Sequence, residues 1–288
     1  MKEEKKSSFK QILLIGSPLF IGLLIFLFWF IQETVDQATF IPSDQNFKFC
    51  PELKKRGFAT KEEEFKGQNL RYYKMKTENA KATLIFFHGS GRSACENREI
   101  LSNLEGLPLN IIITEYPGYG RDLSGETPSE KTILLNSLTL AQKIRKNLPK
   151  NHAFFVYGAS MGTAVATYVA SELNLNGLVL RNPMTSMMDT AKILYKKYPS
   201  KLIDFFFKKH SFEAFRWAKK VKTNVLILYA EKDDWIPIGL ARKQSSHFGK
   251  SKVSFHIIEG AGHMDTYAFP KYKTYLRSFI LNNISKRL

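Results

Sequence analysis

The strongest constraint on the fold lies in residues 153–173. An apolar run, AFFVY (153–157), leads into GASMG (158–162), and a pattern with helical spacing continues from Thr163 to Leu173. This order predicts a strand, a sharp turn and a helix. A G-x-S-x-G turn in that setting is typical of a nucleophile elbow, in which small flanking residues let strand and helix pack closely and the serine hydroxyl is raised above the sheet. Ser160 is therefore the candidate nucleophile.

A serine nucleophile needs a histidine base and a carboxylate that holds the imidazole in the right tautomer. Both groups follow downstream. A predicted buried strand at residues 224–229 is followed by Asp233 and Asp234, and the next predicted strand runs into His263. Each of these groups comes at the carboxyl end of a strand, where parallel sheets place their ligands. Ser160, Asp233 and His263 are expected to meet at this edge, and Asp234 is the alternative acid.

These motifs resemble the α/β-hydrolases, in particular the membrane-anchored α/β-hydrolase-domain serine hydrolases related to monoacylglycerol lipases. The resemblance runs from about Leu70 to the C-terminus. The loop HGSG (88–91) after a predicted strand is similar to the family's HG-x loop, and YPGYGR (116–121) resembles its DYRGYG turn, from which Glu115 and Pro117 depart. The spacing of the acid after its strand matches the family's G-x-x-D with alanine for glycine, which favours Asp233 over Asp234.

The resemblance implies an α/β fold with a mostly parallel central sheet flanked by helices and a short helical lid. It implies that Ser160 attacks an acyl carbonyl, that His263 and Asp233 assist, and that the backbone N–H groups of Ser90 and Met161 bind the oxyanion. The implied reaction is hydrolysis of carboxylic esters with lipid-like or medium-chain acyl groups, without a cofactor. A thioesterase, protein deacylase, amidase or peptidase with the same triad is an alternative, as is a catalytically silent interaction protein.

The N-terminus predicts a transmembrane anchor. Residues 12–31 carry no charge and are rich in Leu, Ile and Phe, and four lysines precede them. Twenty apolar residues at helical rise just span a hydrocarbon core. A cleaved signal peptide shares this pattern, but no convincing small-x-small cleavage site follows. By the positive-inside rule the N-terminus is cytoplasmic, and the catalytic domain is expected on the periplasmic, extracellular or luminal side.

The chain has only two cysteines, Cys50 and Cys95, so disulfides do not build this fold. One bridge can form in an oxidising compartment. Because nothing in their spacing demands pairing, two free thiols are the expected state.

The same reasoning divides the chain into a cytoplasmic basic N-terminus (1–11), the anchor (12–31), a linker and approach to the sheet (32–69), and a hydrolase domain (70–288) with a lid insertion at about 184–222. In the stretch 189–222 basic residues far outnumber acidic ones, and aromatic residues are interleaved with them. A basic helix with a bulky apolar face can lie on an anionic membrane. Alternatively, the aromatic side chains only cover the core and the lysines only face water.

Other partners are not expected. The net charge of +17 is compatible with nucleic-acid binding, but no recognised nucleic-acid module is present. The sequence holds no phosphate-binding G-x-x-x-x-G-K-[ST] loop, and His152, His210, His247 and His256 have no partner at metal-ligand spacing. We therefore expect neither a metal nor an organic cofactor.

Overall fold

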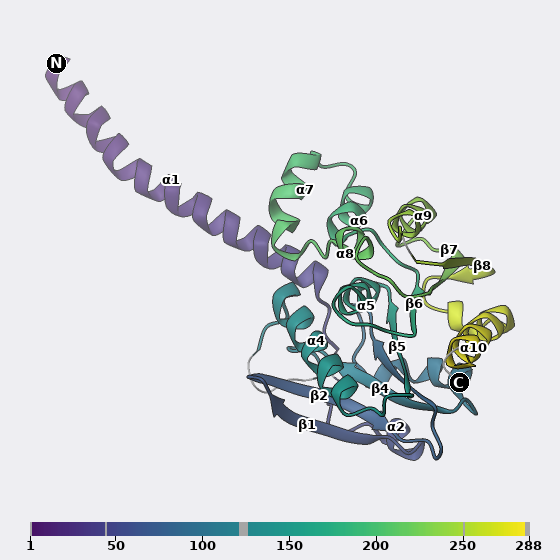
Figure 1. Ribbon diagram of the computed structural model, residues 1–288. Helices are drawn as coiled ribbons and strands as arrows, with labels where there is room; N and C mark the ends of the chain where they lie inside the picture. Colours follow the sequence, from purple (N-terminus) through teal and green to yellow (C-terminus); the bar gives the residue numbers. More distant parts are fainter. Residues whose placement is uncertain (1, 44, 121–125, 250, 286–288) are drawn as a thin grey trace. The chain divides into compact units, whose positions relative to one another are not determined.

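The computed structural model of this protein describes residues 2–43, 45–120, 126–249 and 251–285, with side chains from residue 20 onward except at 98 and 99. The chain divides into two units, residues 1–39 and 40–288 (Figure 1). Arg121, the last residue of the predicted DYRGYG-like turn, lies outside the described residues.

The first unit is one helix, α1 (Lys2–Thr39). Its segment Phe20–Thr39 is long and apolar enough to cross a membrane by length and composition, and only 6% of its most apolar window is buried. The helix continues for eight residues past Ile31, where the sequence predicted that the anchor ends. Residues 32–39 are thus helical rather than linker.

The second unit is built on an eight-stranded sheet with the order β1-β2-β4-β3-β5-β6-β7-β8. β1 pairs antiparallel with β2, and β2 pairs antiparallel with β4; every other pairing is parallel. This arrangement confirms the predicted α/β fold with a mostly parallel sheet. The strands are β1 (Ala59–Phe65), β2 (Gln68–Met75), β3 (Ala82–Phe87), β4 (Leu109–Glu115), β5 (Ala153–Ala159), β6 (Gly177–Arg181), β7 (Val225–Lys232) and β8 (Val253–Gly262).

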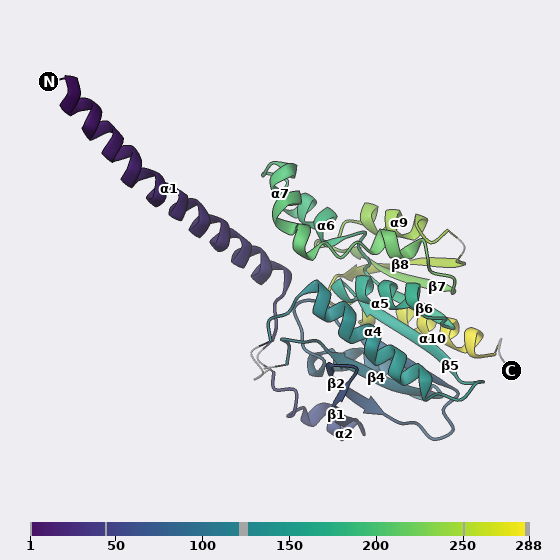
Figure 2. The same ribbon diagram turned by 60° about the vertical axis from the view of Figure 1, so that its left-hand side comes forward.

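Helices cover both faces of this sheet (Figure 2). Side chains of α4, α5, α8 and α9 pack into one apolar cluster, and those of α2, α3 and α10 pack into another. The central strands alternate between the clusters: Phe154 and Val156 face the first, Phe155 and Tyr157 the second. The α-helices of this unit are α2 (Pro51–Lys55), α3 (Leu101–Leu104), α4 (Glu130–Lys146), α5 (Met161–Glu172), α6 (Met187–Leu194), α7 (Ser200–Phe207), α8 (Ala214–Ala218), α9 (Ile238–Ser246) and α10 (Pro270–Ser285); the 3₁₀ helices are η1 (Cys95–Ile100), η2 (Lys208–His210) and η3 (Thr266–Ala268).

All seven residues of β5 are buried, as are all six of β3. Strands that are covered on both faces read as continuous apolar runs rather than as alternating ones, which explains why AFFVY predicted a strand. The central position of β5 places the turn that follows it in the middle of the sheet's carboxyl edge.

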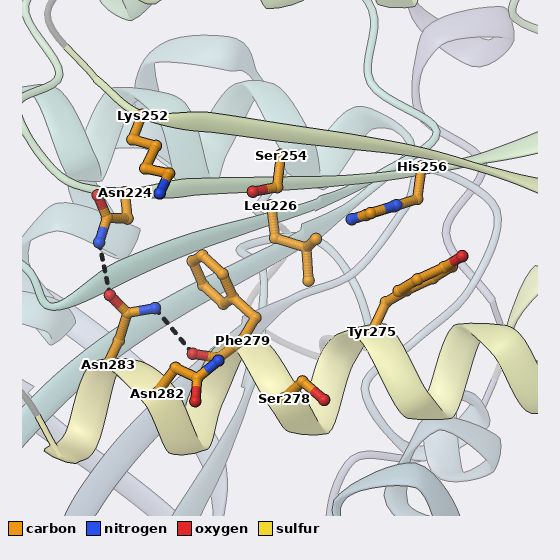
Figure 3. A pocket seen from close by; sticks show the side chains of 10 residues that line it. All are labelled: Asn224, Leu226, Lys252, Ser254, His256, Tyr275, Ser278, Phe279, Asn282 and Asn283. Atoms are coloured by element: carbon orange, nitrogen blue, oxygen red, sulfur yellow. Dashed lines mark hydrogen bonds between the residues drawn. The ribbon is translucent and has the colours of Figure 1, made fainter.

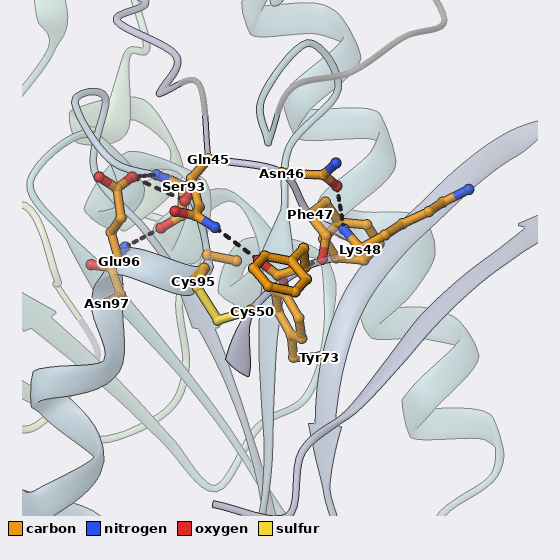
Figure 4. The surroundings of a disulfide bond; sticks show 12 residues. Gln45, Asn46, Phe47, Lys48, Cys50, Tyr73, Ser93, Cys95, Glu96 and Asn97 are labelled. Atoms are coloured by element: carbon orange, nitrogen blue, oxygen red, sulfur yellow. Dashed lines mark hydrogen bonds between the residues drawn. A yellow bond between two sulfur atoms is a disulfide. The ribbon is translucent and has the colours of Figure 1, made fainter. Parts of the chain in front are cut away.

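Residues 40–69, predicted to be a linker and an approach to the sheet, contain α2, β1 and the start of β2. They are also tied to the domain by a disulfide between Cys50 and Cys95 (Figure 4). The expectation of two free thiols was therefore wrong. The folded chain brings the two Cα atoms, 45 positions apart in sequence, to 5.8 Å, a separation typical of disulfides. Both cysteines are buried.

The lid insertion between β6 and β7 consists of α6, α7, η2 and α8. Its aromatic residues differ in exposure. Phe206, Phe207 and Phe212 are buried, whereas Tyr198 and Phe205 are 50% and 62% exposed. The insertion therefore covers part of the core and also exposes bulky apolar side chains to solvent.

Candidate active site

The turn after β5 has the backbone of a nucleophile elbow. Ser160 has φ 54° and ψ −123°, a conformation that L-residues rarely adopt and that is held by the surrounding structure. The two glycines allow the close approach that this turn needs. A Cβ on Gly158 would lie 2.1 Å from the Gly162 carbonyl oxygen, and a Cβ on Gly162 would lie 2.2 Å from the Phe87 carbonyl oxygen. Both positions therefore require glycine.

The structure brings Ser160, His263 and Asp233 together. Nε2 of His263 lies 3.1 Å from Oγ of Ser160, and Nδ1 lies 2.7 Å from Oδ2 of Asp233. With the proton on Nδ1, the imidazole donates to the carboxylate and accepts the serine hydroxyl. The His263 side chain is 7% exposed, and that of Asp233 is fully buried. The serine hydroxyl is thus within hydrogen-bond distance of a base, and that base is within hydrogen-bond distance of an orienting acid.

The two candidate acids are in different environments. The Asp233 carboxylate turns inward, where its Oδ1 accepts hydrogen bonds from the backbone N–H groups of Trp235 (3.0 Å) and Ile236 (2.8 Å). With the imidazole it has three donors, which offset the cost of burying its charge. Asp234 is exposed. The geometry therefore joins Asp233, and not Asp234, to His263.

The HGSG loop lies against the elbow, since a Cβ on Gly89 would be 3.3 Å from the Cβ of Ser160. Nδ1 of the buried His88 donates to the Gly89 carbonyl oxygen at 2.7 Å. The Gly89 carbonyl and the Ser90 N–H belong to one trans peptide group, in which the C=O and the N–H point in opposite directions. Because the carbonyl points toward the His88 ring, the Ser90 N–H points away from it. Met161, the second predicted oxyanion donor, is the first residue of α5.

Further hydrogen bonds hold the same loop. The hydroxyl of Tyr116 donates to the His88 carbonyl at 2.9 Å, and that of Tyr119 donates to the Ser90 carbonyl at 3.0 Å. Burial raises the pKa of Tyr116 and of Tyr119 well above its ordinary value, so both stay protonated donors. His88 also lies 3.4 Å from the Glu115 carboxylate, and both side chains are fully buried. His88 thus helps to hold the loop through its contacts with Gly89, Tyr116 and Glu115.

Sequence reasoning overlooked Trp235. Its indole ring is stacked on the His263 imidazole with centroids 5.7 Å apart and planes inclined by 17°, and it is 51% exposed. Nothing in the local pattern distinguishes this tryptophan, apart from its place two residues after the acid. It covers the base on its solvent side.

A separate cavity of about 220 Å³ lies between β8 and α10 (Figure 3). His256 in its wall stacks on Tyr275 at 3.8 Å, and burial lowers the pKa of this histidine below its ordinary value. The lining consists of Asn224, Leu226, Lys252, Ser254, His256, Tyr275, Ser278, Phe279, Asn282 and Asn283. Because no predicted site residue belongs to it, this cavity is distinct from the candidate active site.

Comparison with known families agrees with this geometry. The family model described as "Serine aminopeptidase, S33" matches residues 78–214, which include the HGSG loop and the elbow. The esterase Pf2001 of Pyrococcus furiosus has the same fold: the structures align with a TM-score of 0.65 over 85% of this chain and 97% of that one, at 17% identity. The chain has an α/β-hydrolase fold, and these matches support a serine hydrolase of the esterase or lipase type.

Two named relatives are similar to most of this chain. The chain is 26% identical over 241 residues to the "Lysophosphatidylserine lipase ABHD12" of Macaca fascicularis, an alignment that covers 74% of this chain and 59% of that protein. It is 28% identical over 214 residues to the "Alpha/beta hydrolase domain-containing protein 17B" of Xenopus tropicalis, covering 72% and 68%. The alignment with the lipase thus spans about three fifths of that protein's length.

Proposed function

We propose that this protein hydrolyses carboxylic esters with lipid-like or medium-chain acyl groups through an acyl-enzyme on Ser160. The observation that carries the proposal is the position of the His263 ring, 3.1 Å from the serine hydroxyl and 2.7 Å from the Asp233 carboxylate. A nucleophile, a base and an orienting acid at hydrogen-bond distance are the requirements of serine acyl transfer. A silent interaction protein has no need of this arrangement.

In the proposed mechanism, Oγ of Ser160 attacks the ester carbonyl carbon while Nε2 of His263 takes the hydroxyl proton. The negative charge on the carbonyl oxygen is stabilised by the N–H groups of Ser90 and Met161, which are fixed before the charge develops. His263 then gives its proton to the leaving alcohol, and the acyl group stays on Ser160. Water, activated by the same histidine, releases the acid and restores the serine.

The choice of bond and acyl group rests on the relatives. One is named a lysophosphatidylserine lipase and a structural neighbour is an esterase, which favours esters. The matching family is described as an aminopeptidase, so a peptide bond is the main alternative, with thioesters next. The test offers the purified protein three substrates that carry the same acyl chain as an ester, a thioester and an amide, and compares their kcat/KM values. A higher kcat/KM on the thioester or the amide would replace the ester proposal.

We further propose that α1 anchors the protein in a membrane, with the N-terminus in the cytoplasm and the hydrolase unit on the other side. The apolar segment Phe20–Thr39 and the lysines near the N-terminus support this orientation. The disulfide between Cys50 and Cys95 adds independent support. Such bonds persist in the periplasm, the lumen or the exterior and are rare in the cytosol.

We expect a thiol reagent applied to denatured protein from unreduced membranes to leave Cys50 and Cys95 unlabelled. Full labelling is expected after reduction, and a C-terminal reporter that works only outside the cytoplasm should be active. The N-terminal lysines should be retained in the mature protein. Activity of a cytoplasm-only reporter would reverse the orientation, and a mature N-terminus near Ala38 would make the segment a cleaved signal peptide.

A second membrane contact is proposed for the lid. Its outward surface carries large apolar side chains that are 38–62% exposed: Ile193, Leu194, Tyr195, Tyr198, Leu202 and Phe205. The exposed lysines Lys196 and Lys197 lie within this stretch, and Lys208 and Lys209 follow it. Apolar side chains beside basic ones match the interface of an anionic membrane. The contact would bring the site to its substrate.

Replacement of Lys196, Lys197, Lys208 and Lys209 by Gln should slow hydrolysis of a lipid ester held in mixed micelles with an anionic lipid. Each base near such a surface contributes up to about 1 kcal/mol of attraction, which salt screens. Turnover of a short soluble ester should stay within about twofold, since it needs no surface. The matched control replaces four exposed lysines outside the lid: Lys54, Lys55, Lys61 and Lys76. Equal losses in the two variants, or equal losses on the two substrates, would contradict the proposed contact.

A further inference from the structure

Asn182 follows the last residue of β6 and is almost completely buried, with 1% of its surface exposed. Its φ of 51° lies in the left-handed region, which asparagine tolerates better than most other residues. Its backbone N–H donates to the Leu228 carbonyl at 3.0 Å. This conformation turns the end of β6 while keeping it joined to β7.

The side-chain amide of Asn182 makes three hydrogen bonds. Oδ1 accepts from the backbone N–H of Ala230 at 2.9 Å, and Nδ2 donates to the His263 carbonyl at 3.1 Å and to Oγ1 of Thr266 at 3.2 Å. The partners fix the orientation of the amide, because the Ala230 N–H is only a donor and the His263 carbonyl is only an acceptor. A residue lacking either half of the amide cannot make both main-chain contacts.

These partners belong to the segments that carry the candidate triad. Ala230 lies in β7, and its carbonyl accepts the Asp233 N–H at 3.2 Å. The carbonyl of Arg181, the residue before Asn182, accepts the Ser160 N–H at 2.9 Å. The Asn182 side chain therefore connects β7, the strand before the acid, with the main chain of the base. The peptide group before Asn182 connects the same turn with the elbow.

We infer that Asn182 is a positioning residue for the reaction. It holds the main chain of His263 against β7, so that the imidazole stays between the Asp233 carboxylate and the Ser160 hydroxyl. The inference rests on the proposed function, since it concerns the same serine and histidine. In this role Asn182 acts through the backbone on either side of the site and touches no substrate. Its loss should impair the chemical step while leaving substrate binding nearly unchanged.

The test compares Asn182→Ala with Asn176→Ala in the full-length protein in detergent, using a short soluble ester. Asn176 precedes the same strand, and its Oδ1 accepts the Phe154 N–H at 2.9 Å, so its replacement also removes a side-chain bond to a strand. For Asn182→Ala we expect kcat to fall about 10²-fold with KM within about twofold, the size of effect that misplaced catalytic groups produce. The rate of inactivation by a fluorophosphonate should fall in parallel. Asn176→Ala should change the melting temperature and leave kcat and the inactivation rate near wild type.

Asn182→Asp has the same shape and keeps an acceptor for Ala230, but it has no N–H to donate to His263. A folded Asp variant with low kcat supports the inference even where the Ala variant does not fold. Wild-type kcat in either folded variant would overturn it, as would a loss that appears only in KM. A different result would contradict the proposed function, namely ester hydrolysis that persists in Ser160→Ala. The two failures are therefore distinguishable.

Discussion

Ser160→Ala should abolish ester hydrolysis, with kcat lowered about 10⁶-fold, because the acyl group then has no nucleophile to receive it. The same variant should lose fluorophosphonate labelling, which reports the serine directly. His263→Ala should lose nearly as much activity, since it removes the base that lies 3.1 Å from the hydroxyl. The measurement is turnover of a soluble ester by full-length protein, together with the stoichiometry of labelling.

The double variant Ser160→Ala/His263→Ala should be little worse than either single variant, because residues that act as one unit have strongly non-additive effects. Ser171→Ala, at the far end of the same helix, provides a matched control and should keep wild-type turnover. Undiminished labelling of Ser160→Ala would show that another nucleophile reacts, and the proposed mechanism would be wrong.

Asp233→Asn should lower kcat about 10⁴-fold, the loss produced where an orienting carboxylate becomes an amide. An Asn at this position can donate to Nδ1 and so favours the tautomer whose Nε2 carries the proton. That tautomer cannot accept the hydroxyl proton of Ser160. KM should change little, because the buried carboxylate faces the imidazole and two backbone N–H groups rather than the substrate.

Asp234→Asn is the matched control, since it makes the same change of charge one residue further along the chain. Because Asp234 is exposed, we expect its kcat to stay within about twofold of wild type. A larger loss for Asp234→Asn than for Asp233→Asn would assign the role of the acid to Asp234.

Much of the fold was predictable because its signals are local. The apolar runs of β5 and β7 predict buried strands, and the glycines beside Ser160 predict the close packing that the turn requires. Residues 40–69 were harder to place. Their strand β1 contains the charged run KEEE and lies at the edge of the sheet, where many of its side chains face water. Such a strand lacks the apolar run by which the central strands are recognised.

The candidate site was predictable where it follows the ends of strands. Ser160, Asp233 and His263 come after β5, β7 and β8, and the parallel pairing of neighbouring strands brings their ends to one edge. Trp235 and Asn182 could not be recognised in this way. Their places against His263 depend on how separate turns meet after folding.

The sequence by itself determined the central strands, the elbow at Ser160 and the apolar helix at the N-terminus, because each depends on residues close together in the chain. Tertiary structure alone decided three other features. It placed the Asp233 carboxylate, which the spacing after the strand had only favoured, against the imidazole and the backbone N–H groups of Trp235 and Ile236. It paired Cys50 with Cys95 across 45 positions and placed the Asn182 amide between β7 and His263. Contacts of this kind depend on distances in the folded chain, which the spacing of residues along the sequence does not specify.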